Sequence, residues 1–405
     1  MVPCTALTGV ENLHKHLFYG AGQVKPPALV ELAEQMVRIA AVLGLLMLFL
    51  PQYPERTVGL IVSGMVICEV FSAGALLWLY YKRRAGLFQG GPGEPKTVRR
   101  RRITSIAIPV GANALLGNLL GAVNTAMIPR KLVEAGLERS EAISQFGIIS
   151  GMTMPMLALP TVFLGALNLV LLPRVARAYA LERMERVRHL LDRGITVVAV
   201  LTLPAMGAMA VLGKDLGQLM FRQEVGAYLL PLALVMAMSC YCSVLAAELN
   251  MVGRQRWVAL VSLLGGVVQL WFTLWLVPIP DVGMRGYVIG AMVSVGLECA
   301  LCLWKLLRAT GMRGDGYRWL IAPGLAASLA ALTGNLLLRW LKDHGVSVIP
   351  AGVVVLLFGA VIYLAALQAQ GIEVKTLLWN RHKKTPTVKY PLAFERYKIT
   401  PAWRR

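Results

Sequence analysis

Residues 349–370 read IPAGVVVLLFGAVIYLAALQAQ, a stretch that contains no charged side chain. A helix rising about 1.5 Å per residue needs about 20 apolar residues to cross a hydrocarbon layer about 30 Å thick. The rest of the chain contains similar stretches, so ten spans are predicted in all, near 28–50, 57–81, 103–128, 146–172, 193–213, 226–250, 257–277, 286–304, 319–338 and 349–370. Core helices of soluble proteins are shorter and striped with polar residues. The sequence therefore predicts an all-α, polytopic membrane protein.

The gaps between these spans alternate in their content of basic residues. Gaps 82–102, 173–192, 251–256 and 305–318 hold 19 Lys and Arg residues together, whereas the five intervening gaps hold 9. Short basic loops stay in the cytoplasm during insertion. The first set is therefore predicted to be cytoplasmic, and an even number of spans places both termini, including the basic tail 371–405, on that side.

The formal net charge of +20 follows from the same pattern. The run Arg99 to Arg102 lies just outside an apolar span, where basic residues set topology and attract anionic membrane lipid. These roles explain the charge better than nucleic-acid binding does. The chain has no glycine-rich phosphate loop of the GxxxxGK[ST] type, so no nucleotide-binding motor is expected.

The residues that usually carry catalysis or metal binding are scarce and scattered. Cys240, Cys242, Cys299 and Cys302 lie inside apolar spans, without carboxylate or histidine companions in the sequence, and cysteines in such places behave as small hydrophobic residues. The histidines lie in loops away from any candidate nucleophile. We therefore expect no catalytic residues, no metal site, no cofactor and no enzymatic activity.

Several charged residues fall within predicted spans, and four of them are candidates for a special role: Glu34, Arg38, Glu69 and Glu298. Glu34 and Arg38 are four residues apart, so they share one helix face and can form an ion pair. This pair is either an interfacial contact near a helix end or part of a functional site. Glu69 lies in the middle of the second span, and we expect it to face a water-filled cavity. Glu298 lies in the eighth span, and we expect it to form a hydrogen bond to a neighbouring helix.

The third span carries a stripe of polar and small residues. Its members recur at steps of three or four: Pro109, Asn113, Gly117, Leu120 and Asn124. Such a stripe lines either a close helix contact or an aqueous cavity, and its two asparagines favour the cavity. Asn168 in the fourth span and Gln269 in the seventh are candidates to face the same space.

Prolines inside the spans indicate bent helices. Four prolines each remove a backbone hydrogen bond within a predicted span: Pro109, Pro155, Pro160 and Pro204. Bent helices around a polar cavity are typical of alternating-access transporters. The gap 173–192 predicts a separate amphipathic helix lying on the inner membrane surface.

Many short motifs, in a particular order, resemble one family. They are Ile108-Pro109, Ile128-Pro129-Arg130-Lys131-Leu132, Glu134-Ala135-Gly136-Leu137, Glu141-Ala142, Gln145-Phe146-Gly147, Met154-Pro155, Leu159-Pro160, Leu172 to Ala178, Asn250 to Arg254 and Pro278-Ile279-Pro280 with Gly283, Gly286 and Gly290. From about Leu17 to the last span, the chain resembles the stage V sporulation protein B group of polysaccharide exporters. That group lies in the superfamily shared by lipid II flippases, O-antigen flippases and multidrug and toxin extrusion transporters.

The resemblance implies a flippase-like, two-lobe bundle of fourteen helices, with two six-helix lobes around a cavity and a final pair that can form a lipid groove. On that pattern, 1–27 is a cytoplasmic segment, 28–102 a remnant of the first lobe, 103–310 the second lobe, 311–370 the final pair and 371–405 a cytoplasmic tail. The chain is then expected to lack the family's first four helices, and those helices are a potential partner as a separate chain.

The resemblance also implies a function. We expect a flippase of lipid-linked cell-wall or polysaccharide precursor, similar to lipid II, in a spore former. Many relatives carry an aspartate where this chain has Asn124, which removes a candidate charge. Arg38 is the intramembrane cation of the first span, and its guanidinium suits bidentate contact with a pyrophosphate. The alternatives are a cation-coupled drug exporter that uses Glu69, and a non-transporting remnant or scaffold for wall synthesis.

Overall fold

Helices make up almost all of the computed structural model, and no strand occurs in the residues that it describes. These are residues 2–20, 23, 25–49, 55, 57–87, 95–158, 161–223 and 226–372. A helical fold suits a lipid environment, because lipid offers no hydrogen-bond partners and a helix satisfies its backbone hydrogen bonds internally.

Eight helical segments of the described chain are long and apolar enough to cross a membrane, which confirms a multi-pass membrane protein. They are α2 (Lys25–Phe49), α3 (Thr57–Leu87), α8 (Met184–Phe221), α9 (Leu229–Met251), α10 (Gln255–Trp275), α11 (Met284–Thr310), η4 (Tyr317–Ile321) with α12 (Ala322–Asp343), and α13 (Val348–Ala369). The two other predicted spans, 103–128 and 146–172, fall on helices in which several side chains lie outside the described part.

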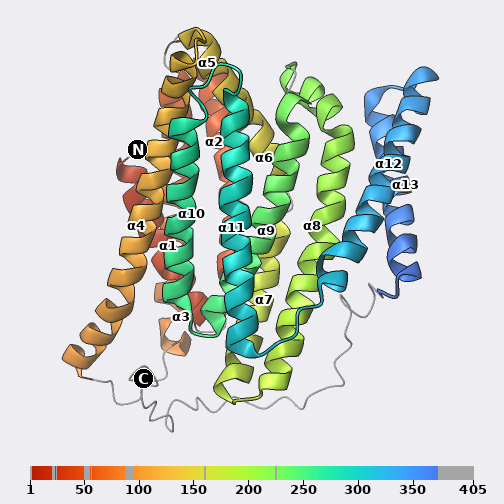
Figure 1. Cartoon of the computed structure of the whole chain (residues 1–405). Coiled ribbons are helices and arrows are strands. Elements are labelled where there is room, and N and C mark those ends of the chain that lie inside the picture. The colour runs from red at the N-terminus through yellow and green to blue at the C-terminus, as the bar shows by residue number, and fades with distance from the viewer. Residues whose placement is uncertain are drawn as a thin grey trace. The chain divides into compact units, whose positions relative to one another are not determined.

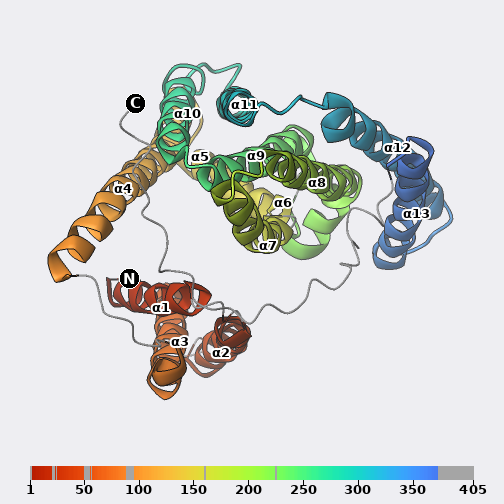
Figure 2. The ribbon, with the colours of Figure 1, turned by 90° about the horizontal axis from the view of Figure 1, so that it is seen from below.

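The chain divides into two units, Met1–Ile103 and Thr104–Arg405. In the first unit, α2 and α3 pack along one another, and α1 (Val2–Gly20) packs against α3 (Figure 2). Phe18 of α1, Val30 of α2 and Leu76 of α3 form their shared buried cluster. The predicted polar segment before the first span is therefore largely a helix, and it joins the packed core of this unit.

The second unit contains α4 (Lys96–Glu134), most of which belongs to it, and the elements from α5 to α13. In Figure 1, α8 lies beside α9, α10 beside α11, and α12 beside α13. A cluster of buried apolar side chains joins α7, α8, α9 and α11 around Leu191, Leu249 and Leu306. A second cluster, around Ile128, Leu232 and Val288, joins α4, α9 and α11. This packing fixes the helices that carry the polar residues described below.

The predicted span at 146–172 is divided into several helical pieces. They are α5 (Arg139–Gly147), the π-helix η2 (Ile148–Thr153), α6 (Met154–Leu157) and α7 (Thr161–Ala180). Pro155 has no backbone N–H to donate, so the regular helix cannot continue unchanged across it, and a wider turn precedes it. The Thr153 hydroxyl donates to the Ile148 carbonyl oxygen at 3.0 Å within that turn.

The prediction of an amphipathic surface helix at 173–192 is wrong. Its residues belong to the end of α7, which runs to Ala180, and to the start of α8, which runs unbroken from Met184. A short turn with Glu182 in the left-handed conformation (φ 54°) separates the two helices. Both helices simply extend beyond their apolar stretches, so charged residues at two helix ends gave the appearance of one amphipathic helix.

Glycines allow α11 to approach the chain that precedes it very closely. A Cβ atom at Gly286 would lie 2.8 Å from Leu276 Cβ and 2.9 Å from the Leu276 backbone carbon. A Cβ at Gly290 would lie 2.6 Å from Phe272 Cβ. Close approach of this kind, through small residues four apart, is a standard way to pack membrane helices.

We predict that Gly286→Ala lowers the thermal stability of the purified protein. The added methyl group meets backbone, which cannot rotate away, and overpacking of this kind costs about 1–3 kcal/mol. Gly324→Ala in α12 is the matched control, because nothing lies within 4 Å of its Cβ position. Thermal unfolding in detergent measures both variants, and equal midpoints would contradict the close packing.

Candidate functional site

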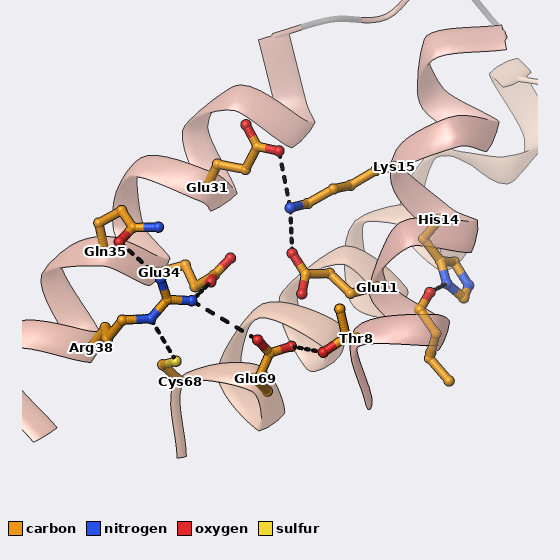
Figure 3. A network of polar contacts seen from close by, with 11 residues as sticks. Thr8, Glu11, His14, Lys15, Glu31, Glu34, Gln35, Arg38, Cys68 and Glu69 are labelled. Carbon is orange, nitrogen blue, oxygen red and sulfur yellow. Dashed lines mark hydrogen bonds and ion pairs between the residues drawn. The ribbon is translucent and has the colours of Figure 1, made fainter. Parts of the chain in front are cut away.

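A network of charged side chains ties the three helices of the first unit together, and Figure 3 shows it. It contains Glu11 and Lys15 from α1, Glu31, Glu34 and Arg38 from α2, and Glu69 from α3. We refer to these six residues as the N-terminal polar network. Glu11, Glu34 and Glu69 are buried, with 3%, 4% and 8% of their surface exposed.

Arg38 occupies one half of this network. Its guanidinium pairs with Glu34, as the spacing of four residues predicts, and Nη1 donates to Gln35 Oε1 at 3.1 Å. Nε lies 3.4 Å from Cys68 Sγ, and Nη2 lies 3.9 Å from Glu69 Oε1. Three of the residues predicted to line a substrate site thus lie together, because Glu34 and Glu69 both contact the Arg38 guanidinium. A third of the Arg38 side chain remains exposed, at 33%.

Lys15 occupies the other half. Its ammonium group pairs with Glu11 and lies 2.9 Å from Glu31 Oε1 on α2. Burial by itself would lower the pKa of Lys15, but the hydrogen bonds that Lys15 donates to Glu11 and Glu31 outweigh burial and raise this pKa. Burial likewise opposes ionisation of Glu11, whose pKa is nevertheless lowered by Lys15. Both groups are therefore held in their charged forms.

The network contains more acid than base, because four carboxyl groups face two cations. Glu69 also accepts a hydrogen bond of 2.9 Å from the Thr8 hydroxyl of α1. Glu34, Cys68 and Glu69 each offer one possible metal-ligand atom, a carboxylate oxygen or Sγ. These three atoms all lie within 4.8 Å of one another, a spacing that a metal ion could bridge. However, the Arg38 guanidinium contacts all three of these residues and supplies the positive charge there.

Glu11 and Lys15 were not among the residues predicted from the sequence, although their spacing carries a usable signal. They are four residues apart, as Glu34 and Arg38 are, and this spacing allows an ion pair on one helix face. The signal was missed because 1–27 was interpreted as a segment outside the membrane bundle rather than as a helix packed into it.

The polar candidates of the second unit make separate helix contacts. The Thr273 hydroxyl of α10 lies 2.6 Å from Asn124 Oδ1 of α4, so Asn124 turns toward α10. Gln269 Nε2 donates to the Tyr287 carbonyl oxygen of α11 at 3.3 Å. Gly117 is exposed, and the side chains of Asn113 and Asn168 lie outside the described part of the structure. The cavity interpretation of this stripe therefore stays a prediction.

Two further carboxyl groups of the second unit are shielded from solvent, Glu248 fully and Glu298 in part. Glu298 of α11 lies 3.5 Å from the Cys242 thiol of α9, so the expectation that this cysteine has no carboxylate companion is wrong. Glu248 of α9, which the sequence analysis missed, is 1% exposed, and neither of its oxygens has a hydrogen-bond partner in the described residues. Its carboxyl group packs directly on Gly194 of α8. An ionised carboxylate without a donor costs several kcal/mol, so this packing favours the uncharged acid.

An apolar cavity of about 310 Å³ lies between α8, α12 and α13. Small side chains form much of its wall, among them Ala208 of α8, Ala331 and Gly334 of α12, and Gly359 of α13. Tyr363 also lines it, and its hydroxyl donates to the Val200 carbonyl oxygen at 3.0 Å. Because its walls are almost entirely apolar, this cavity suits a hydrocarbon chain rather than a polar group.

Comparisons with known proteins confirm the resemblance drawn from the motifs. The chain is similar to stage V sporulation protein B of Bacillus subtilis (strain 168), with 22% identity over 322 residues, or 76% of this chain. The chain spans 61% of the length of that relative. No protein-family model matches this chain.

The fold is similar to that of a solved lipid II flippase, MurJ, in an inward closed conformation. The TM-score is 0.57 at 10% sequence identity, and the match covers 91% of this chain and 72% of the solved chain. This likeness confirms the predicted flippase-like helical bundle.

We predict that Arg38→Ala destabilises the first unit, because it leaves Glu34 and Glu69 buried without their cation. Removing one partner of a buried pair costs about 3–5 kcal/mol, and partial exposure of Arg38 lowers the expected loss to about 2 kcal/mol. The double variant Arg38→Ala/Glu34→Gln should recover part of that loss. Thermal unfolding measures the series, and no recovery in the double variant would mean that the pair is not coupled.

Proposed function

We propose that this chain takes part in flipping a lipid-linked cell-wall or polysaccharide precursor, similar to lipid II, across the membrane. The proposal is for a transport protein and not for an enzyme. The observation that carries it is the extent of the fold match, since most of this chain follows the helices of a lipid II flippase. The similarity to a sporulation protein supports a role in spore formation.

The cavity between α8, α12 and α13 supports the lipid half of the proposal. A lipid-linked precursor has a long hydrocarbon chain, which must be accommodated whenever its headgroup moves. Alanine and glycine on the cavity wall leave room for such a chain and offer it no polar group. We propose that part of the substrate's hydrocarbon chain occupies this cavity.

The N-terminal polar network supports the headgroup half. Arg38 is partly exposed and presents a planar guanidinium, which suits bidentate contact with a pyrophosphate. Contact with a pyrophosphate would break the ion pair between Arg38 and Glu34. Substrate contact is therefore favoured when Glu34 is protonated and attracts Arg38 less strongly. We therefore propose Arg38 as the residue that contacts the phosphate groups, and Glu34 as the residue that holds it in the absence of substrate.

The cation-coupled exporter is less well supported. That function needs an acid that is free to bind a coupling cation, and Glu69 was the candidate. Glu69 accepts a hydrogen bond from Thr8 and lies 3.9 Å from Arg38, so a cation is already beside it.

Narrowing the apolar cavity tests the proposal. We predict that Ala331→Trp lowers the rate of precursor flipping severalfold, since the indole fills space that the hydrocarbon chain would occupy. Leu332→Trp is the matched control, because Leu332 is 65% exposed on the same helix and does not line the cavity. The assay follows precursor that becomes accessible to an added cleaving enzyme, in the cells that produce this protein. Equal rates in the two variants would exclude the cavity from the transport route.

The orientation of the chain is a second proposal, with both termini in the cytoplasm. It predicts that 173–192 is cytoplasmic and that 129–145 is external. Glu182→Cys and Glu138→Cys, placed in these two segments, should therefore react with a membrane-impermeant thiol reagent from opposite sides. Labelling of both from one side of intact cells would show that a span between them was assigned wrongly.

A further inference from the structure

Two tryptophans and two cations form a compact group where α10 begins and α11 ends. Trp257 of α10 and Trp304 of α11 have ring centroids 5.8 Å apart. Lys305 Nζ lies 4.7 Å from the Trp257 centroid and 5.8 Å from that of Trp304. The Arg308 guanidinium carbon lies 5.5 Å from the Trp304 centroid. These distances fall within the range of cation–π attraction. We refer to these four residues as the Trp–cation site.

Among the described residues, no carboxylate balances the positive charge of this site. Neither Lys305 nor Arg308 forms an ion pair within the described part of the chain. They are three residues apart on α11, so they share a helix face and repel one another. Two more cations, Arg254 and Arg256, are exposed at the start of α10, whose first turn has no acidic residue. The N-terminal end of a helix adds further positive potential.

An apolar surface continues from the site along α10. Leu260, Leu264, Val267 and Trp271 follow Trp257 at steps of three or four residues, and each is between 45% and 64% exposed. They therefore form one exposed stripe along the helix. The surface thus combines a cationic, aromatic end with an apolar strip, which matches the headgroup and acyl chains of a lipid.

We propose that the Trp–cation site binds the phosphate of an anionic glycerophospholipid, with an acyl chain lying along the exposed stripe of α10. Tryptophan is favoured at the membrane interface, where its ring meets both headgroup and hydrocarbon. The cations supply the charge that the phosphate requires, and the rings hold the cations in place. The proposal does not depend on what the chain transports.

Native mass spectrometry of the whole chain in detergent tests the proposal directly, with phosphatidylglycerol and phosphatidylcholine as probes. The test variant is Lys305→Gln/Arg308→Gln. Each cation near an anionic lipid contributes enough that removal of two should weaken phosphatidylglycerol binding roughly 10- to 30-fold. Phosphatidylcholine binding should not change.

The matched control is Arg130→Gln/Arg285→Gln. It removes the same charge from two exposed arginines that also form no ion pair among the described residues. Arg130 lies near the end of α4, and Arg285 lies at the start of α11, at the other end of that helix from Trp304. Its phosphatidylglycerol affinity should stay within about twofold of the unmodified chain. Equal losses in test and control would show diffuse attraction to a basic protein and would overturn the site.

Two further arms separate the parts of the proposal. Trp257→Leu/Trp304→Leu keeps every charge and should still weaken phosphatidylglycerol binding, so unchanged binding would exclude the aromatic contribution. Excess glycerol 3-phosphate should not displace the lipid, and full displacement would indicate a site for small anions instead. If the double charge variant does not fold, the exposed single variant Arg308→Gln should show an intermediate loss, and no loss would also overturn the proposal.

Discussion

A charge carried into a bundle of membrane helices loses the stabilisation that water would give it, and the first unit is organised around this cost. Arg38 lies among Glu34, Gln35, Cys68 and Glu69, so α2 and α3 are joined by polar contacts as well as by apolar packing. Lys15 joins α1 to α2 by the same principle. Charged contacts, as well as the apolar packing of Phe18, therefore join α1 to this unit.

The second unit meets the same cost by a different route. Among its described residues, the buried Glu248 and the partly buried Glu298 each lie against a glycine of a neighbouring helix. Glu248 lies on Gly194 and Glu298 lies on Gly265. Glycine leaves space for the carboxyl group without requiring a cation. The same small residue permits the close approach of α11 to Leu276 and Phe272, so glycine positions set both the packing and the places where acids fit.

The two units differ in the chemistry that they offer to a substrate. The first presents a partly exposed guanidinium held by carboxylates, and the second presents an apolar cavity lined by small side chains. A lipid-linked sugar has two corresponding parts, a diphosphate headgroup and a hydrocarbon chain. This correspondence, together with the fold, is the physical basis for our proposal that the chain acts on lipid-linked substrates rather than on small cations.

The membrane class, the positions of most spans and the pairing of Glu34 with Arg38 could be predicted from the sequence alone, because hydrophobic length and a spacing of four residues are local properties. The sequence did not reveal that Glu69 and Cys68 join that pair, that Cys242 contacts Glu298, or that Glu248 is buried without a partner. It also placed a surface helix at 173–192, where two longer helices end and begin. These features depend on which helix faces meet and on how closely they approach, and only tertiary packing decides that, because residues far apart in the chain leave no periodic signal of their contact.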